Sequence, residues 1–233
     1  MSRPVKTPAP SSQAKTPSSQ EPRELRQPRD PRAEATREHI LDAALEEFSR
    51  QGFAGARLEA IAAQAGCAKR MIYYYFEHKE GLYLAVLERA YRDIRESELA
   101  LDLHALDPAD AIRQLAFASF DYHEAHPAFT RLVALENIQE GKFITKMAMI
   151  EDVNHSAIKE LADILARGQA QQLFRDDLAP VDLHMVISAF CAFRVDHRYT
   201  FSKLFGRDLM DAQLRLHHKE LLVDTLMRLL KRD

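Results

Sequence analysis

Two histidines and an aspartate lie close enough together in the sequence to suggest a metal site. Asp121, His123 and His126 fall within six residues, and histidines three apart on a helix share one face. Pro127 follows at once, however, so His126 lies at a helix end, and no further ligand stands at a telling spacing. The sequence also lacks a glycine-rich phosphate loop and a nucleophile elbow. We therefore predict a protein that is not an enzyme and has no metal or cofactor. A metal-dependent enzyme is the alternative.

A second group of residues has the chemistry of a nucleic-acid contact. Lys69 and Arg70 are adjacent cations that can donate to guanine O6 and N7 or to phosphate. Residues 57–79 hold four lysines and arginines against two carboxylates. The whole chain has a net charge of −3, so bulk charge does not indicate a nucleic-acid binder. A non-specific architectural DNA-binding protein, which depends on charge, is therefore the less favoured alternative.

The elements that must position these residues are expected to be helices. From residue 33 onward apolar residues recur at helical spacing, with no convincing strand pattern. The N-terminal part predicts helices over about 34–51, ending at Gly52, from Leu58 to Gly66, over about 69–75 and from Lys79 onward. Short helices joined at Gly66, where a tight turn needs a residue without a Cβ penalty, suggest a helix-turn-helix. The N-terminal residues of its second helix would lie nearest the bases.

The rest of the chain predicts further helices, about nine in all, and an all-α fold class. They run from Pro108 to about 125, from Pro127 onward, over 142–167 with a stop at Gly168, over 180–204, and over 208–231.

Residues 33–82 resemble the N-terminal DNA-binding domain of TetR-family transcriptional regulators. The matching segments are Arg37-Glu-His-Ile-Leu-Asp-Ala-Ala, Phe48-Ser-Arg-Gln-Gly-Phe53, Ile61-Ala-Ala-Gln-Ala-Gly66, Met71-Ile-Tyr-Tyr-Tyr-Phe76 and Glu77-His-Lys-Glu-Gly-Leu-Tyr83, with the run from Tyr73 to Leu82 as the most specific part. The resemblance implies a three-helix helix-turn-helix domain over 33–80 and a larger helical effector-binding and dimerisation domain over 81–233. It also implies a sequence-specific regulator, more commonly a repressor, that binds a palindromic operator as a homodimer and is released by a small-molecule effector.

The resemblance further implies which residues meet DNA. Tyr73 and Phe76 lean toward the core, whereas Tyr74 and Lys79 reach phosphates. The full set of DNA-contact candidates is Arg37, Arg57, Ala68, Lys69, Arg70, Met71, Tyr73, Tyr74 and Lys79.

Two alanines depart from the family pattern at positions expected to be helix N-caps. Ala56 stands where the family usually has Thr, and Ala68 where it usually has Ser or Thr. Alanine cannot accept the unpaired backbone N–H there, and each site loses around 1 kcal/mol and a hydroxyl that could meet phosphate.

The last two predicted helices, 180–204 and 208–231, are implied to pair with the same helices of a second subunit. A single recognition helix reads few base pairs, so a two-fold dimer would place two of them in successive major grooves, roughly 34 Å apart. An unknown effector would lie in a pocket within about 82–200, with apolar walls and few polar groups. The lining candidates are Phe117, Phe120, His123, Phe129, Glu136, Asn137, Phe143, Met147, Phe174, His184, Phe190 and Arg194. A cation in an apolar helix needs a partner, and for Arg194 the simplest is Asp196 or a carboxylate of the second subunit.

Residues 1–32 differ in composition from the rest of the chain. They hold seven of the ten prolines and seven basic residues against three acidic ones, a net charge of +4. So few apolar residues cannot offset the entropy of ordering, and we predict a disordered tail.

Two distant cysteines suit a reducing cytoplasm. The lack of a secretory signal or a sufficiently long apolar stretch predicts a cytoplasmic protein without membrane contact.

Overall fold

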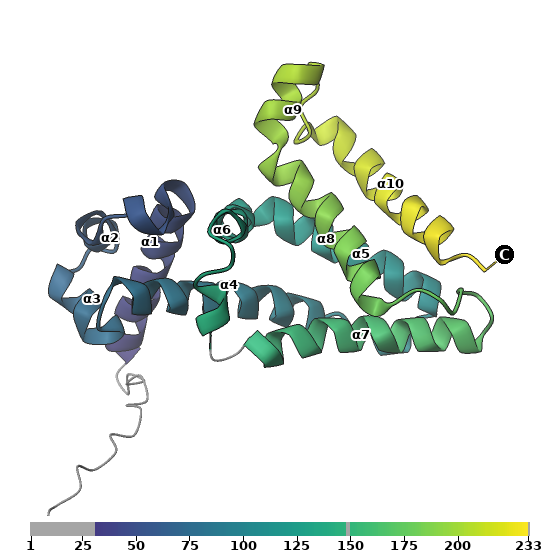
Figure 1. Ribbon diagram of the computed structural model, residues 1–233, viewed down its shortest axis with the longest axis horizontal. Coiled ribbons are helices and arrows are strands. Elements are labelled where there is room, and N and C mark those ends of the chain that lie inside the picture. The colour runs from purple at the N-terminus through teal and green to yellow at the C-terminus, as the bar shows by residue number, and fades with distance from the viewer. Residues whose placement is uncertain (1–30, 148–149, 233) are drawn as a thin grey trace, which may run out of the picture.

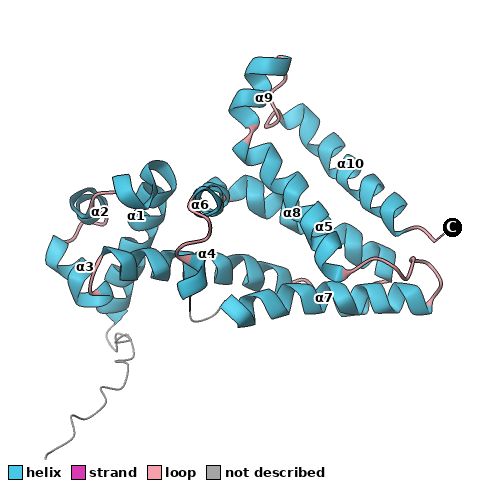
Figure 2. Ribbon diagram, viewed as in Figure 1, coloured by secondary structure: helices cyan, strands magenta, loops and turns pink. Residues whose placement is uncertain are grey.

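The computed structural model describes residues 31–147 and 150–232, and the side chains of 150–157 lie outside the description. The prediction of a disordered tail therefore falls almost wholly outside the described residues. Within them the predicted all-α fold is confirmed, because they form ten α-helices, two short 3-10 helices and no extended strand (Figures 1 and 2). No described helix is long and apolar enough to cross a membrane.

Four helices build one end of the molecule (Figure 1). They are α1 (Pro31–Gly55), α2 (Leu58–Gln64), α3 (Lys69–Phe76) and α4 (Lys79–Leu99). The first starts three residues before its predicted position and is interrupted at Gly52, as the sequence predicts.

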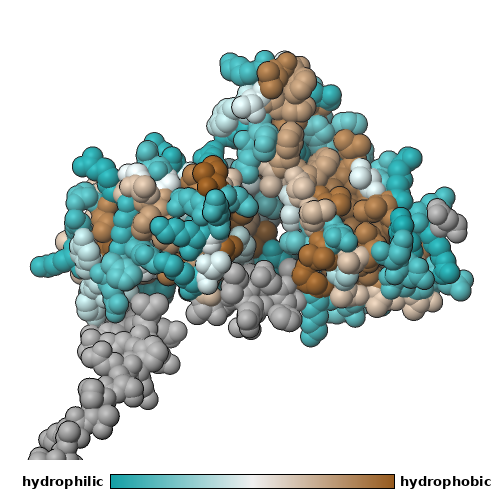
Figure 3. Space-filling model, viewed as in Figure 1, coloured by the Kyte–Doolittle hydropathy of each residue, from teal (hydrophilic) through white to brown (hydrophobic). Residues whose placement is uncertain are grey.

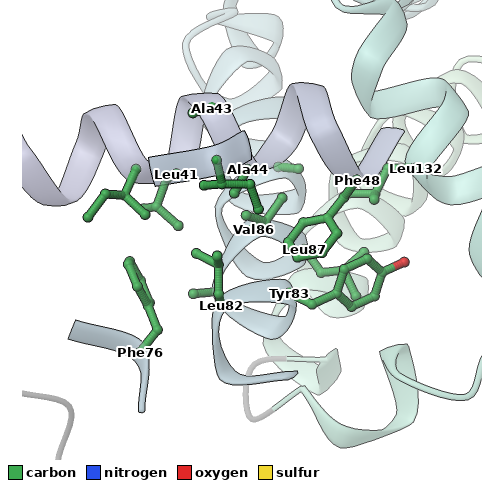
Figure 4. Close-up of a cluster of buried hydrophobic side chains, with 14 of the residues drawn as sticks. Leu41, Ala43, Ala44, Phe48, Phe76, Leu82, Tyr83, Val86, Leu87 and Leu132 are labelled. Atoms are coloured by element: carbon green, nitrogen blue, oxygen red, sulfur yellow. The ribbon is translucent and has the colours of Figure 1, made fainter. Parts of the chain in front are cut away.

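The core of this end follows from helical spacing on α1 and α4. Leu41, Ala44 and Phe48 recur three to four residues apart on α1 and are buried against the same spacing on α4, where Leu82 and Tyr83 point toward them (Figure 4). The ring of Tyr83 meets Phe48 edge-on, with centroids 4.8 Å apart. This packing fixes α4, the long helix that leads away from this end of the molecule, against α1.

The remaining helices form a second body around their own core. They are α5 (Pro108–Ala125), α6 (Pro127–Ile138), α7 (Ile150–Ala170), α8 (Pro180–Asp196), α9 (Arg198–Phe205) and α10 (Ala212–Leu230), with the 3-10 helices Leu103–Ala105 and Ile144–Lys146 between them. Three of these helices begin with proline in the first turn, as predicted, because a residue without an N–H costs nothing there. The helix α6 packs against both α1 and α8 and so lies between the two bodies.

Three predicted helix boundaries are wrong. The helix expected over 180–204 is two helices that meet at His197. The helix expected over 142–167 begins only at Ile150 and runs through Gly168. Gly168 is required instead by close packing, since a Cβ there would lie 2.0 Å from the ring of Phe174. The last helix starts at Ala212 because the Asp211 side chain accepts the N–H of Gln213 and caps it.

Candidate nucleic-acid interface

The turn between α2 and α3 is closed by the backbone. Gly66 has a positive φ of 65°, and no atom lies within 4 Å of a Cβ built there, so glycine is favoured by conformation rather than by space. The N–H of Cys67 donates to the carbonyl of Ala62 at 3.0 Å. Ala68 then serves as the N-cap of α3 without a side-chain bond. The helix-turn-helix predicted around Gly66 is confirmed.

One face of α3 belongs to the core and the other to the surface. Ile72, Tyr75 and Phe76 are buried, and the Tyr75 hydroxyl donates to the carbonyl of Ala33 at 3.0 Å. Tyr73 and Tyr74 are 46% and 58% exposed. The expectation that Tyr73 leans inward is wrong, because Ile72 and Phe76 set an inward stripe that Tyr75 joins at i+3. Tyr73 therefore lies on the outer face.

The two cations at the start of α3 have different surroundings. Lys69 Nζ lies 2.6 Å from Glu59 Oε1 of α2 and 5.7 Å from the ring centre of Tyr73. The bond to Glu59 raises the pKa of Lys69, and the same bond lowers the pKa of Glu59. Arg70 is exposed, and its side chain makes no hydrogen bond or ion pair within the described part of the chain. Arg70 is thus the α3 cation whose donors are available to another molecule.

The other candidate cations differ in the contacts that they already make within the chain. Arg57 is exposed at the N-cap of α2, and its backbone N–H donates to Glu47 at 3.0 Å. Lys79 donates to the carbonyl of Ala54 at 3.3 Å, and Arg37 pairs with Glu38 at 2.8 Å. Arg37 and Lys79 must give up or share these contacts to reach phosphate.

One of the two predicted alanine caps is wrong. Ala56 is buried, and the N-cap of α2 is Arg57, whose side chain makes no cap bond. Ala68 does occupy the N-cap of α3, so a backbone N–H at the start of that helix is left for solvent or a ligand.

The sequence-adjacent metal candidates do not converge. Asp121 pairs with Lys219 at 2.6 Å, on α10. His123 is buried, and its Nδ1 lies 3.1 Å from the Thr130 hydroxyl. His126 Nδ1 lies 2.9 Å from a backbone carbonyl. No cluster of three metal-ligating side chains occurs in the residues that the structure covers, so the metal-dependent enzyme loses its proposed ligand set.

A cavity of about 270 Å³, partly open to solvent, lies among α4, α5, α6 and α8. Four of the twelve predicted pocket residues line it, namely His123, Phe129, Asn137 and His184. Burial, and then the charge of Arg95, lower the pKa of His123 from 6.5 to about 4, so its ring is neutral at pH 7. Other side chains that line the cavity were not among the predicted residues, for example Tyr91, Arg95, Thr130, Ser188 and Asp196.

The remaining eight candidates do not line this cavity, so the prediction of one common pocket is wrong for them. Glu136, Phe143 and Met147 are buried in the core shared by α1 and α4. Phe117, Phe120 and Phe174 belong to the second core, with Phe117 only partly buried. Phe190 and Arg194 line a groove between α8 and α10. Helical spacing predicts that such apolar residues are buried. It does not predict whether each one faces a core, the cavity or the groove.

Arg194 is buried and fully engaged within its own chain. Its Nη2 donates to the carbonyl of Leu209 at 2.7 Å, its Nη1 lies 3.3 Å from Glu124 Oε2, and its Nε lies 3.2 Å from His218 Nδ1. The prediction that Arg194 pairs with Asp196 is wrong. Glu124 lies 70 residues earlier on α5, so Arg194 ties α8 to α5 and to the segment that leads into α10.

The groove between α8 and α10 is open, apolar and has a volume of about 590 Å³. Its walls include Met185, Phe193 and Leu221, which are 61%, 43% and 44% exposed. In Figure 3 hydrophobic residues gather over these two helices. Large apolar side chains exposed side by side mark a surface that favours a partner.

Glu136 joins α6 to α4 and to the turn after α6. Its Oε1 accepts the hydroxyl of Tyr83 at 2.8 Å, and its Oε2 accepts the N–H groups of Phe143 and Ile144 at 3.1 and 3.0 Å. All three bonds lie in the interior or at its margin. The cavity wall formed by α6 is therefore bonded to α4, the helix that follows the helix-turn-helix.

Two family models match the chain. The model described as bacterial regulatory proteins of the tetR family matches residues 40–86, and the model of a tetracyclin repressor-like C-terminal domain matches residues 108–226. The HTH-type transcriptional repressor NicS of Pseudomonas putida is 36% identical over 86% of this chain and 94% of its own length. The HTH-type transcriptional regulator RutR of Escherichia coli K12 is 33% identical over 64% of this chain and 66% of its own.

The fold has matches among solved structures as well. A TetR family transcription regulator from Marinobacter aquaeolei VT8 superposes with a TM-score of 0.68 and 19% identity, covering 87% of this chain and 98% of that one.

Proposed function

The chain belongs to the TetR family of bacterial transcriptional regulators, and we propose that it is a repressor that binds a palindromic operator as a homodimer. The observation that carries the proposal is the outer face of α3. Arg70, Tyr73 and Tyr74 stand there exposed and without competing ion pairs, on the second helix of a helix-turn-helix.

The recognition step follows from the geometry of α3. Eight residues at 1.5 Å per residue give a helix roughly 12 Å long, which fits across the major groove but reads few base pairs. Arg70, in the first turn of α3, can donate in a bidentate manner to guanine. Tyr74 can donate its hydroxyl to phosphate and fix the register.

The test of these roles is DNA binding by single variants. Arg70→Ala and Tyr74→Ala should each weaken binding to an operator selected from random duplexes, measured by fluorescence anisotropy at fixed salt. A lost base contact costs about 1–3 kcal/mol, and the dimer has two copies, so affinity should fall at least about thirtyfold for Arg70→Ala. Arg113→Ala removes an exposed arginine of α5 and is the matched control. Unchanged affinity in both α3 variants would contradict the assigned roles.

We further propose that the groove between α8 and α10 is filled by the same helices of a second subunit. The apolar side chains of this groove are the kind that stable homodimer interfaces bury. A two-fold axis there would present two α3 helices on one side of the dimer.

An arginine at the groove tests this interface. Leu221→Arg should convert the dimer to monomers in analytical ultracentrifugation, because the charge would have to be buried without a partner. Leu173→Arg, at a 48% exposed leucine outside the groove, should leave the dimer intact. A Leu221→Arg protein that stays dimeric at low micromolar concentration would contradict the interface.

We also propose that a small molecule in the cavity among α4, α5, α6 and α8 releases the DNA. The wall formed by α6 is bonded through Glu136 to Tyr83 on α4, and α6 packs on α1. A ligand that moves α6 therefore shifts the DNA-binding end of each subunit and the spacing of the two α3 helices. A hundredfold loss of DNA affinity requires that the ligand prefer the released state by about 2.7 kcal/mol.

A further inference from the structure

An ion pair joins the two helices of the helix-turn-helix on their exposed side. Lys69 is the first residue of α3, and its Nζ lies 2.6 Å from Oε1 of Glu59 in the first turn of α2. The Lys69 side chain is 41% exposed and that of Glu59 is 60% exposed, so burial holds neither of them. Lys69 Nζ also lies 5.7 Å from the centre of the Tyr73 ring. Both contacts draw the ammonium group toward the protein.

The neighbouring cations are not restrained by a carboxylate. The Arg70 side chain is exposed, Arg57 is exposed at the start of α2, and Lys79 donates to a backbone carbonyl, which carries no net charge. Among the cations of 57–79, all of which the structure describes, Lys69 is therefore the one that forms a salt bridge. Its charge is already balanced within the subunit.

A balanced lysine changes the kind of DNA affinity that the helix-turn-helix provides. The ammonium group of lysine is a compact charge on a flexible stem, and on DNA it binds phosphate without regard to sequence. Such contacts supply nearly all of the affinity for non-specific DNA. The Glu59 carboxylate competes with phosphate for Lys69 because both are anions with oxygen acceptors. The base-reading donors of Arg70 stay available.

We propose that Glu59 is a specificity-determining residue, which holds Lys69 in place of a DNA phosphate and so lowers the affinity for duplexes that lack the operator sequence. This inference rests on the proposed DNA-binding function and deepens it. On random DNA a released lysine can reach a phosphate in any register that the protein adopts. On the operator the base contacts fix one register, so a released Lys69 gains less there. Glu59 thus widens the difference between the two affinities.

Glu59→Gln tests the proposal, because it removes the charge and keeps the size of the side chain. The full chain is titrated with a random-sequence duplex and with the selected operator, by fluorescence anisotropy at several salt concentrations. Affinity for the random duplex should rise about two- to tenfold for a dimer, the range set by two exposed ion pairs. The plot of log affinity against log salt should steepen by about 0.9 for each Lys69 that gains a phosphate. Affinity for the operator should rise less.

Two further variants show whether Glu59 acts through Lys69. Glu46→Gln removes an exposed carboxylate of α1 that pairs with no cation in the described part of the chain, and it should leave the ratio of operator to random affinity unchanged. In a Lys69→Gln background, Glu59→Gln should no longer raise the affinity for random DNA, since no ammonium group remains to be released.

Several results would overturn the inference. They are a random-duplex affinity that does not rise in Glu59→Gln, a salt dependence that does not steepen, a rise that persists in the Lys69→Gln background, and an equal rise for operator and random DNA. If Glu59 only stabilised α2, its loss would weaken binding to both duplexes and leave the salt dependence unchanged.

The unmodified protein separates this inference from the proposed function. If it prefers the selected operator and Glu59→Gln keeps the same preference, the role of Glu59 alone is refuted. If the unmodified protein binds the selected and random duplexes equally, the proposed function itself is refuted.

Discussion

The bond between Tyr83 and Glu136 gives the sharpest test of how the two bodies are joined. Tyr83→Phe removes the hydroxyl that donates to Glu136 Oε1 at 2.8 Å and leaves the ring in its contacts with Phe48 and Phe143. The other carboxylate oxygen keeps its two backbone donors. The substitution therefore isolates one buried hydrogen bond that links α4 to α6.

The magnitude follows from the chemistry of that bond. A hydrogen bond to a charged group contributes about 1.5–3 kcal/mol, and the vacated carboxylate oxygen is too deeply buried for water to replace the donor freely. We expect the free energy of unfolding to fall by that amount. For a chain of this size each kcal/mol lowers Tm by roughly 2–4 °C, which gives about 3–12 °C in all.

The assay is thermal and urea unfolding of Tyr83→Phe beside Tyr91→Phe at equal protein concentration. The Tyr91 hydroxyl, on the same helix, has no hydrogen-bond partner among the described residues, so its loss should change stability little. If the bond also carries the ligand signal, Tyr83→Phe should bind ligand normally but weaken ligand-induced release of DNA. Equal stability of Tyr83→Phe and the unmodified protein, within about 0.5 kcal/mol, would show that this hydrogen bond does not stabilise the folded chain.

Three further substitutions probe local features. Ala68→Ser should supply the missing N-cap of α3 and stabilise the protein by about 1 kcal/mol, seen as a rise in Tm of roughly 2–4 °C; no rise would show that the N–H is already satisfied. His123 is buried with its pKa lowered to about 4, so the unfolded state binds more protons below pH 6.5 and stability is lost as pH falls from 6.5 toward 4. At pH 5 this loss should reach about 2 kcal/mol and be absent from the same titration of His123→Gln. Gly168→Ala should lower stability by at least about 1–3 kcal/mol in urea unfolding, because its Cβ overlaps the Phe174 ring; an unchanged midpoint would mean that the ring moves aside freely.

Local signals predicted much of the fold. Prolines at 108, 127 and 180 mark the first turns of α5, α6 and α8, and Gly66 marks the turn before α3. Each of these features depends on the conformation of one residue and its near neighbours. On α3 the prediction is wrong about which of three adjacent tyrosines points inward. The i, i+3, i+4 spacing of Ile72, Tyr75 and Phe76 indicates that the buried one is Tyr75.

The cavity and the long-range contacts could not be predicted in the same way. Arg194 bonds to Glu124, which is 70 residues away in the sequence, and Glu136 bonds to Tyr83, which is 53 residues away. Apolar content alone did not separate core phenylalanines from cavity walls, because both are buried at helical spacing. Arg95 carried no sequence signal of its own, since charged residues on helices usually face solvent.

We propose that two α3 helices of a symmetric dimer read duplex DNA. The most direct test is to enrich duplexes from a random pool with the full chain and to sequence the survivors. We expect a two-fold symmetric sequence whose half-sites are centred about 10 base pairs apart or a multiple of that. Its enrichment should disappear with Arg70→Ala. Survivors without symmetry, or an unchanged selection by the Arg70→Ala protein, would contradict it.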